Sequence, residues 1–427
     1  MSIEEIHNLF LTCGEISIDT RKIEPNSFFV ALKGERFDAN TFTKQALENG
    51  ASYVLIDNAD YFIDDSTVLV EDCLTTLQEL AKFHRQFLKL PIIALTGSNG
   101  KTTTKELINV VLSKKYNAKA TVGNLNNHIG VPLTLLSFNT ETEIGIVEMG
   151  ANHQNEIEFL CDLAQPNYGY ITNFGKAHLE GFGGVEGVIK GKSEMYTYLK
   201  SNNKLVFVNL DDQIQNTKTI DFNRITFSQK NKKATVFIES VTANPFVKIK
   251  TCNIDFNSHL IGLYNANNIN AAITIGNYFG VTTNDCKEAI ESYVPENNRS
   301  QLLTKGSNEI ILDAYNANPS SMMVALENFI QVDKINKVVI IGDMYELGES
   351  TAAEHKAIVN FLDKSSSFEC HFVGKYFFDT SIQNKNFHFY ETFEDFAQFL
   401  KNIKLDHKTI LIKGSRGMAL ERTLEYI

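Results

Sequence analysis

The sequence predicts an α/β protein of three domains, in which the central domain has a mostly parallel sheet and a phosphate-binding loop. Apolar runs alternate with helical stretches along the chain, which is typical of strand–helix–strand units. The segment PIIALTGSNGKTTT, residues 91–104, places a Gly-rich turn and a Lys-Thr pair directly after such a run. A chain of 427 residues is also too long for one ordinary core, so several domains are expected.

The first domain is expected over residues 1–90 and is the smallest. It contains two strand-like runs, SFFVAL and SYVLID, with the helical stretch TFTKQALENGA between them. An amphipathic stretch, LTTLQELAKFHRQFL, follows and ends just before Pro91. This order predicts a small N-terminal α/β domain.

The central domain is expected over residues 91–297. Four apolar runs alternate with helical ones here, IIALTG, IGIVEMG, YGYITNF and KLVFVNL. This alternation predicts a mostly parallel sheet. The stretch near residues 220–260 is instead rich in alternating β-formers, which favours a small antiparallel insertion.

The third domain is expected over residues 298–427, where the pattern starts again as a Rossmann-like α/β unit. Its apolar runs are EIILDAY, KVVIIGDM, CHFVGKY and TILIKGS. Residues with polar side chains, or Gly, follow the apolar part of each run. Ligand-binding residues gather at the carboxyl ends of parallel strands, so these loops are candidates for a site.

The phosphate loop meets the physical requirements of a nucleotide site. Backbone N–H groups of a Gly loop can point at phosphate oxygens, Lys101 adds positive charge, and Thr102 offers a hydroxyl to Mg²⁺. The usual spacing has Gly at position 95, where this chain has Leu95. The alternative, a Gly-rich turn with a surface Lys, does not account for Gly-Lys-Thr directly after an apolar strand.

Further candidates lie in the central domain. Glu148 ends an apolar strand and can hold Mg²⁺, although it could equally be a solvated acid. His178 lies in a Gly-rich loop after another strand, where a histidine that bonds a carbonyl is the simpler alternative. Lys192 lies on an expected helix, and on the residues alone a surface lysine is favoured there.

The third domain adds polar loops after its strands. Asp313 ends a strand and is followed by Tyr315 and Asn316 in a dense polar loop, for which helix capping is the alternative role. Ser415 and Arg416 follow the last strand, and an arginine there suits a carboxylate or a phosphate by bidentate pairing. Each of these alone could be a surface residue.

Composition excludes several classes. The net charge of −11 argues against a general nucleic-acid-binding surface. No apolar run approaches the ~20 residues of a membrane span. The N-terminus MSIEEIHNLF lacks a signal-peptide pattern, and the six cysteines are scattered without a metal-type pair. These features predict a cytoplasmic protein with reduced thiols, no nucleic-acid partner and no membrane association.

The clusters resemble those of the Mur ligases, the ATP-dependent amide-forming enzymes of peptidoglycan precursor synthesis. TGSNGKT is similar to the family's T-G-x-x-G-K-[ST], which lacks the outer Gly as well, and the resemblance covers nearly the whole chain. Within the family, DAYNANPSS, GDMYELGE, KGSRGM and GNLNNHIGVPLTLL resemble the members that join D-alanyl-D-alanine to UDP-N-acetylmuramoyl-tripeptide. The resemblance implies a three-domain Mur ligase architecture.

The resemblance also implies roles for residues in the central domain. Thr102 and Glu148 would hold the Mg²⁺ that bridges the ATP phosphates, and His178 would help to hold a second Mg²⁺. Lys192 matches the family lysine that CO₂ carbamylates, and that modification would make it a further metal ligand. The residues that would cradle the ATP phosphates are Gly97, Ser98, Asn99, Gly100, Lys101, Thr102 and Thr103.

Other implied roles are spread over all three domains. Asn268 would contact adenine and Arg299 would lie near the phosphates. The residues expected to face ATP from the third domain are Asp313, Tyr315 and Asn316, with Arg416 as a catalytic residue. The expected substrate-binding residues are Thr20, Arg21 and Asp38 for the uridine nucleotide, together with Asn126, Asn127 and Ser415.

The chain departs from the family pattern at two places. Asp38-Ala39-Asn40 stands where D-G-H is common, and this departure weakens the case for the N-terminal contacts. Asn155 stands where the family usually has Gly. Neither position belongs to the expected ATP site.

The implied reaction is formation of UDP-N-acetylmuramoyl-pentapeptide, ADP and phosphate through an acyl phosphate, by a monomer. The alternatives are another Mur ligase, a folate-polyglutamate-type ligase that shares the central domain, and a P-loop ATPase switch without ligation. The C-terminal motifs disfavour the first two. The third leaves His178, Lys192 and the N-terminal segment unexplained.

Overall fold

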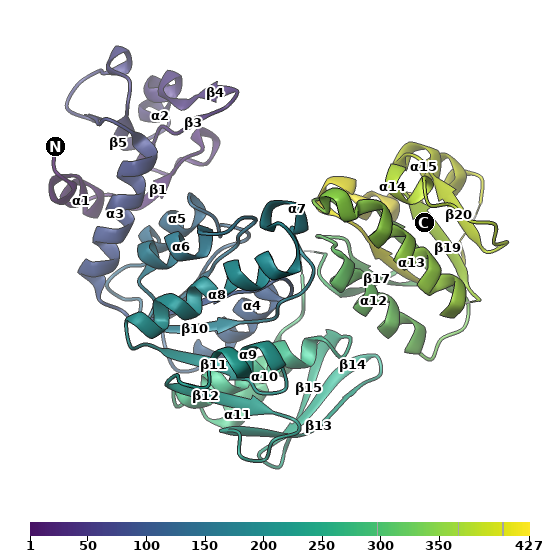
Figure 1. Cartoon of the computed structure of the whole chain (residues 1–427). Helices are drawn as coiled ribbons and strands as arrows, with labels where there is room; N and C mark the ends of the chain where they lie inside the picture. The colour runs from purple at the N-terminus through teal and green to yellow at the C-terminus, as the bar shows by residue number, and fades with distance from the viewer. Residues whose placement is uncertain (297, 366, 404) are drawn as a thin grey trace.

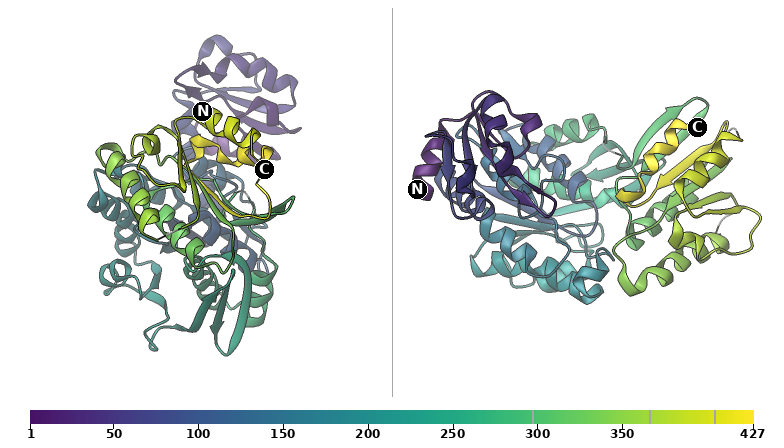
Figure 2. Two further views of the ribbon diagram at one scale, coloured as in Figure 1. Left: turned by 90° about the vertical axis from the view of Figure 1, so that its right-hand side faces the viewer. Right: turned by 90° about the horizontal axis from the view of Figure 1, so that it is seen from above.

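The computed structural model describes residues 1–296, 298–365, 367–403 and 405–427, and the chain folds around three main sheets. Figure 1 shows the N-terminal region, in purple, joined through α3 to a large central region in teal. Seen from above, the N-terminal and C-terminal regions lie at opposite ends, with the central region between them (Figure 2, right). The expected domain boundary at residue 297 falls outside the described residues.

The N-terminal region is a four-stranded parallel sheet in the order β1-β2-β5-β6. The 16-residue helix α3 begins at the Asp72 cap and leads into the central region. Near its end, the Arg85 guanidinium donates to the Ala164 carbonyl at 2.9 Å and so fixes the helix to the central region. The elements are α1 (Ile3–Leu11), β1 (Glu15–Ser17), β2 (Ser27–Val30), β3 (Lys33–Gly34), β4 (Phe37–Asp38), α2 (Thr43–Glu48), β5 (Ala51–Ile56), β6 (Thr67–Leu69) and α3 (Cys73–Leu88).

The central region has a nine-stranded sheet in the order β15-β14-β13-β12-β11-β10-β7-β9-β8. Pairing is parallel from β8 to β13, while β13, β14 and β15 pair antiparallel. The predicted antiparallel insertion is therefore the edge of the same sheet. The strands are β7 (Ile92–Thr96), β8 (Ala118–Ala120), β9 (Ile144–Glu148), β10 (Tyr168–Ile171), β11 (Leu205–Asn209), β12 (Arg224–Ser228), β13 (Val236–Ala243), β14 (Phe246–Thr251) and β15 (Ile254–Ile261).

Helices cover this sheet because their apolar faces pack on its buried strands. Ile93 and Leu95 of β7, for example, share a buried cluster with Leu107 of α4 and Ile269 of α10. The helices are α4 (Lys101–Leu112), α5 (Gly130–Leu136), α6 (Glu156–Ala164), α7 (Leu179–Phe182), α8 (Val185–Ser201), α9 (Gln213–Lys218), α10 (Asn265–Tyr278) and α11 (Thr283–Ser292).

The C-terminal region has a six-stranded sheet in the order β16-β17-β21-β18-β19-β20, in which only the β16–β17 pairing is antiparallel. This is the α/β unit that the restarted pattern predicts. Its strands are β16 (Gln301–Lys305), β17 (Asn308–Asp313), β18 (Lys337–Gly342), β19 (Glu369–Val373), β20 (Phe387–Tyr390) and β21 (Thr409–Lys413). Its α-helices are α12 (Pro319–Gln331), α13 (Thr351–Ser365), α14 (Lys375–Phe378) and α15 (Phe393–Lys401), and η4 (Gly348–Ser350) is a short 3₁₀ turn.

The predicted three-domain α/β architecture, with a central sheet that carries the phosphate loop, is confirmed. The pattern missed several short strands, among them β1, β8, β16 and β20. Among the described helices, none is long and apolar enough to cross a membrane.

Candidate active site

The phosphate loop lies between β7 and α4, and two glycines allow its shape. Gly97 has φ +145° and Gly100 has φ +77°, a region of backbone space that side chains disfavour. A Cβ at Gly97 would lie 1.9 Å from Thr172 Oγ1, and one at Gly100 would lie 2.7 Å from Asn268 Oδ1. The loop therefore packs closely against the end of β10 on one side and α10 on the other.

Hydrogen bonds from the segment after β10 fix the loop backbone. Asn173 Oδ1 accepts from the Asn99 N–H at 3.1 Å, while Thr172 Oγ1 and Asn173 Nδ2 donate to the Asn99 carbonyl at 2.6 and 2.9 Å. Lys101 Nζ donates to the Gly97 carbonyl at 2.8 Å. Burial lowers the pKa of Lys101, and the nearby Glu148 carboxylate opposes that shift.

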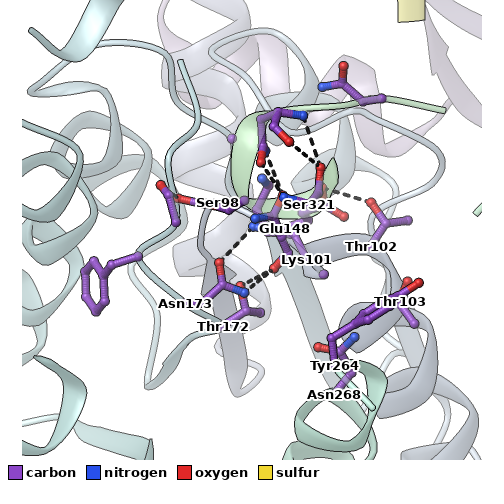
Figure 3. A pocket seen from close by; sticks show the side chains of 18 of the residues that line it. Ser98, Lys101, Thr102, Thr103, Glu148, Thr172, Asn173, Tyr264, Asn268 and Ser321 are labelled. Carbon is purple, nitrogen blue, oxygen red and sulfur yellow. Dashed lines mark hydrogen bonds between the residues drawn. The ribbon is translucent and has the colours of Figure 1, made fainter. Parts of the chain in front are cut away.

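Glu148 at the end of β9 has one carboxylate oxygen engaged and one without a partner. Oε1 accepts from Thr102 Oγ1 at 3.2 Å and from Asn126 Nδ2 at 2.8 Å, whereas the buried Oε2 has no hydrogen bond. Figure 3 shows Glu148 beside Lys101 and Thr102. Carboxylate and hydroxyl oxygens are ligands that Mg²⁺ prefers, so this pair fits the ion. Within the described ranges, no group of three or more His, Cys, Asp or Glu side chains forms a metal centre.

Lys192 lies on α8 and is almost wholly buried, with 1% of its surface exposed. Its Nζ donates to the Ala151 carbonyl at 3.2 Å and lies 5.0 Å from the centre of the Phe182 ring. Burial, with the nearby Lys101 charge, holds the pKa of Lys192 well below its usual value. CO₂ adds to the neutral amine, and this burial favours the neutral form over the charged one, so the environment fits the expected carbamate.

His178 points toward the C-terminal region. Its Nδ1 contacts a carboxylate oxygen of Glu346, which follows β18, and this bond lowers the pKa of Glu346. The Glu180 N–H also donates to the Glu346 carbonyl at 3.3 Å. In this arrangement His178 joins two domains, and its expected role at a second metal stays a prediction. The sequence pattern did not point to Glu346.

The C-terminal wall is held by a partly buried ion pair. Lys413 Nζ lies 2.6 Å from Asp313 Oδ2, and the Ser300 N–H donates to the other oxygen at 3.1 Å. The Arg299 guanidinium lies 3.5 Å from the centre of the Tyr315 ring, and that of Arg416 lies 5.5 Å from it. The Asp313 carboxylate is therefore already bound by protein groups. The Tyr315 ring, at the cavity, lies beside two guanidinium cations.

The loop, Glu148 and this wall enclose one cavity of about 1030 Å³. Most of the predicted residues line it, namely Ser98, Asn99, Gly100, Lys101, Thr102, Thr103, Asn126, Asn127, Glu148, His178, Asn268, Arg299, Asp313, Tyr315, Asn316 and Arg416. Sequence reasoning missed other lining residues, such as Thr172 and Tyr264. Thr172 follows β10, so the strand-end rule used for Glu148 would have found it.

Asn268 lines the cavity, but its amide is already engaged within the protein. Its Oδ1 accepts from Thr104 Oγ1 at 3.0 Å, and its Nδ2 donates to Asn265 Oδ1 at 2.8 Å. In this arrangement the side chain joins α10 to α4. The expected contact with adenine stays a prediction.

The structure does not place six predicted residues in the cavity lining: Thr20, Arg21, Asp38, Gly97, Lys192 and Ser415. Ser415 is buried. Its Oγ is used within the protein, because it accepts from the Tyr345 N–H at 3.0 Å and donates to the Ala317 carbonyl at 3.3 Å. The first three belong to the N-terminal region. There Arg21 binds the carboxylate of Asp19 through two nitrogens at 2.9 and 2.8 Å.

Asn40, one of the departures from the family pattern, has a clear structural role. Its Nδ2 donates to Asp38 at 2.6 Å and to Asp57 at 2.8 Å, and its Oδ1 accepts from the Asp57 N–H at 3.0 Å. Lys33 Nζ lies 2.8 Å from the same Asp57 carboxylate. Asn40 therefore ties the loop after β4 to the end of β5.

Three family models match the chain. They are described as the Mur ligase family catalytic domain over residues 13–85, the Mur ligase middle domain over 95–276, and the Mur ligase glutamate ligase domain over 298–416. The chain is 34% identical over 421 residues to a UDP-N-acetylmuramoyl-tripeptide–D-alanyl-D-alanine ligase of Bacillus subtilis strain 168, covering 96% of this chain and 92% of that protein. It is 32% identical over 433 residues to the ligase of the same name from Escherichia coli K12, covering 98% and 95%.

Solved structures show the same arrangement over the full chain. MurF from Acinetobacter baumannii superposes with a TM-score of 0.86 at 28% identity, covering 99% of this chain and 97% of that one. MurF ligase from Thermotoga maritima, solved in complex with ADP, superposes with a TM-score of 0.83 at 26% identity, covering 98% and 97%.

Proposed function

The chain belongs to the Mur ligase family, and we propose that it joins D-alanyl-D-alanine to UDP-N-acetylmuramoyl-tripeptide at the expense of ATP. One observation carries the proposal. A phosphate loop and a carboxylate with an unpaired oxygen face a polar wall from another domain across one cavity. Such a cavity can hold ATP together with the carboxylate and the amine that the enzyme joins.

An amide does not form readily from a carboxylate and an amine in water, because a carboxylate is a poor electrophile. In the proposed reaction, the terminal carboxylate of the tripeptide attacks the γ-phosphorus of ATP and ADP leaves. The amine of D-alanyl-D-alanine then attacks the acyl phosphate, and the tetrahedral intermediate expels phosphate. The product is UDP-N-acetylmuramoyl-pentapeptide.

The first step brings two anions together, so positive charge is needed at the phosphate loop. Lys101 supplies one such charge, and the N-terminus of α4 points N–H groups at the same place. Mg²⁺ would supply the rest when bound, with Thr102 and Glu148 holding one ion and His178 and carbamylated Lys192 helping to hold a second. His178 would first have to leave Glu346.

The three domains divide the substrates in this proposal. Residues 1–90 bind the uridine nucleotide through Thr20, Arg21 and Asp38, and residues 91–297 bind ATP. Residues 298–427 bind the dipeptide, and the Arg416 guanidinium, which lies 3.3 Å from Glu421 Oε1, would exchange that carboxylate for the one of the dipeptide. Closure of the last domain excludes water from the acyl phosphate. Since one chain supplies every part, we expect the monomer to be active.

The test is phosphate release by the purified protein with ATP, Mg²⁺ and UDP-N-acetylmuramoyl-tripeptide. D-alanyl-D-alanine or single amino acids are added in turn. We expect release that requires the dipeptide, and a pentapeptide product by mass spectrometry. Release with a single amino acid would make the protein another ligase of the family. Release without any acceptor would favour an ATPase and contradict the proposal.

A further inference from the structure

The tip of the phosphate loop is held by two domains at once. The central domain engages the backbone of Asn99 through Thr172 and Asn173. The C-terminal domain engages its side chain, since Asn318 Nδ2 donates to Asn99 Oδ1 at 2.7 Å. Asn318 is buried, with 8% of its surface exposed, so little water competes for this bond.

Asn318 is also the N-cap of α12. Its Oδ1 accepts from the Ser321 N–H at 2.9 Å, and Ser321 Oγ accepts from the Asn318 N–H at 3.0 Å, which completes a capping box. The two ends of one amide therefore have different tasks. The oxygen fixes the start of α12, and the nitrogen reaches the phosphate loop of the other domain.

A second contact supports the same junction. Ser320, two residues after Asn318, accepts from the Lys176 N–H through its Oγ at 2.7 Å. Ser98 Oγ in turn donates to the Gly175 carbonyl at 2.7 Å. The start of α12, the segment after β10 and the phosphate loop thus form one connected set of hydrogen bonds.

We propose that Asn318 is a positioning residue, whose amide nitrogen seats the C-terminal domain on the phosphate loop through Asn99. This inference rests on the proposed function, because it assigns Asn318 to the step that needs both domains. The backbone of Asn99 is held without Asn318, so nucleotide binding does not depend on it. Turnover depends on it, because the C-terminal wall must face the bound nucleotide for ligation.

The test uses Asn318→Ser, because serine is also a good N-cap but cannot reach Asn99. Loss of one buried hydrogen bond should lower kcat about tenfold, while the Kd for a non-hydrolysable ATP analogue stays within about twofold. Asn58→Ser is the matched control, since Asn58 caps a short helical turn in the N-terminal domain and lies outside the cavity. That variant should keep full activity.

A double-mutant cycle then separates the hydrogen bond from other effects. Asn99→Ser should lower kcat by a similar factor, and the double variant should be no slower than the slower single variant. Three results would each overturn the inference. The first is a double variant whose fold-loss in kcat equals the product of the two single losses. The others are an unchanged kcat in Asn318→Ser and a tenfold weaker nucleotide Kd in that variant. Failure of the proposed function can be told apart from failure of this inference. In the former case the unmodified protein itself would show no dipeptide-dependent phosphate release.

Discussion

The polar side chains of the N-terminal domain and those of the cavity differ in how completely they are satisfied. In the N-terminal domain, Arg21 binds Asp19 two residues away, and Asp38 accepts from Asn40. In the cavity, Glu148 Oε2 is buried without a partner, and Lys192, which lies outside the cavity lining, is buried in a setting that disfavours its charge. An unpaired buried carboxylate oxygen is costly to keep, and this one lies beside the phosphate loop, where a bound cation would satisfy it.

Residue type alone therefore does not identify a site. Both regions match family motifs, and both contain carboxylates and cations at strand ends. Among the described residues of these two regions, only the cavity has a buried carboxylate oxygen without a hydrogen-bond partner.

Lys101→Ala should produce the largest loss, about 1000-fold in the rate of dipeptide-dependent phosphate release. The phosphate loop contains no other lysine, so the charge that offsets the meeting of two anions disappears. Lys190→Ala, which removes an exposed lysine of α8, is the control and should retain full activity. Near-normal turnover by Lys101→Ala would remove the basis of the assignment.

Lys192→Ala should lower turnover about 100-fold, and added acetate or formate should restore part of it. The short carboxylate would occupy the place of the carbamate left by the missing side chain. Turnover is measured across a series of acetate concentrations, with chloride at equal ionic strength as the comparison. If acetate has no effect while the variant still binds the nucleotide, the carbamate is excluded.

The packing of α1 against α3 in the first domain should lose stability in acid. Burial lowers the pKa of His7 to about 4, and its Nε2 lies 2.9 Å from His84 Nδ1. Because the folded-state pKa lies below the unfolded value of 6.5, the unfolded chain binds more protons between these pH values. The free energy of unfolding should therefore fall by about 3 kcal/mol as the pH drops through this window.

His7→Gln keeps a donor toward His84 but does not titrate, so its unfolding free energy should fall less over the same window. Urea unfolding at several pH values measures both slopes. His153→Gln, at an exposed histidine, should follow the unmodified protein. Equal slopes for all three proteins would show that His7 takes up no proton on unfolding.

Arg21→Ala should have the smallest effect on the fold and should act on binding alone. The Arg21 side chain is 85% exposed, so the free energy of unfolding should change by less than about 0.5 kcal/mol. If the N-terminal segment binds the uridine nucleotide, KM for that substrate should rise about tenfold with kcat unchanged. A fall in kcat would instead show that Arg21 affects the catalytic step. The N-terminal domain and the cavity would then differ less in function than we expect.

The sequence predicted the parts of the fold that local pattern encodes. Buried strands such as β7, β9 and β18 are continuous apolar runs, and chemistry-bearing residues follow them. Short strands such as β8, with three half-buried residues, have no such pattern. The antiparallel strands were recognised, but their continuity with the parallel sheet depends on the β12–β13 pairing, which is not a local property.

The same limit applies to the site. Gly97, Lys101 and Glu148 follow from motif and strand position, whereas the role of Lys192 was implied by the family resemblance alone. The contacts of Glu346 with His178 and of Asn318 with Asn99 join residues 168 and 219 positions apart, across a domain junction. A single sequence carries no signal for how two separately folded domains meet. Ser415 is the opposite case. Its motif predicted a ligand contact, but its hydroxyl forms hydrogen bonds that join two loops.

The close approach of Gly97 to Thr172 constrains how this gene can vary. Any side chain at position 97 would overlap the Thr172 hydroxyl, which follows β10 and lies 75 positions along the chain, and a residue other than glycine would be strained by the backbone conformation there. A single compensating change cannot relieve both conflicts. Random mutagenesis of the phosphate loop should therefore recover active clones with substitutions at Ser98 far more often than at Gly97. Substitutions of Thr172 by smaller residues should not enlarge the set accepted at Gly97.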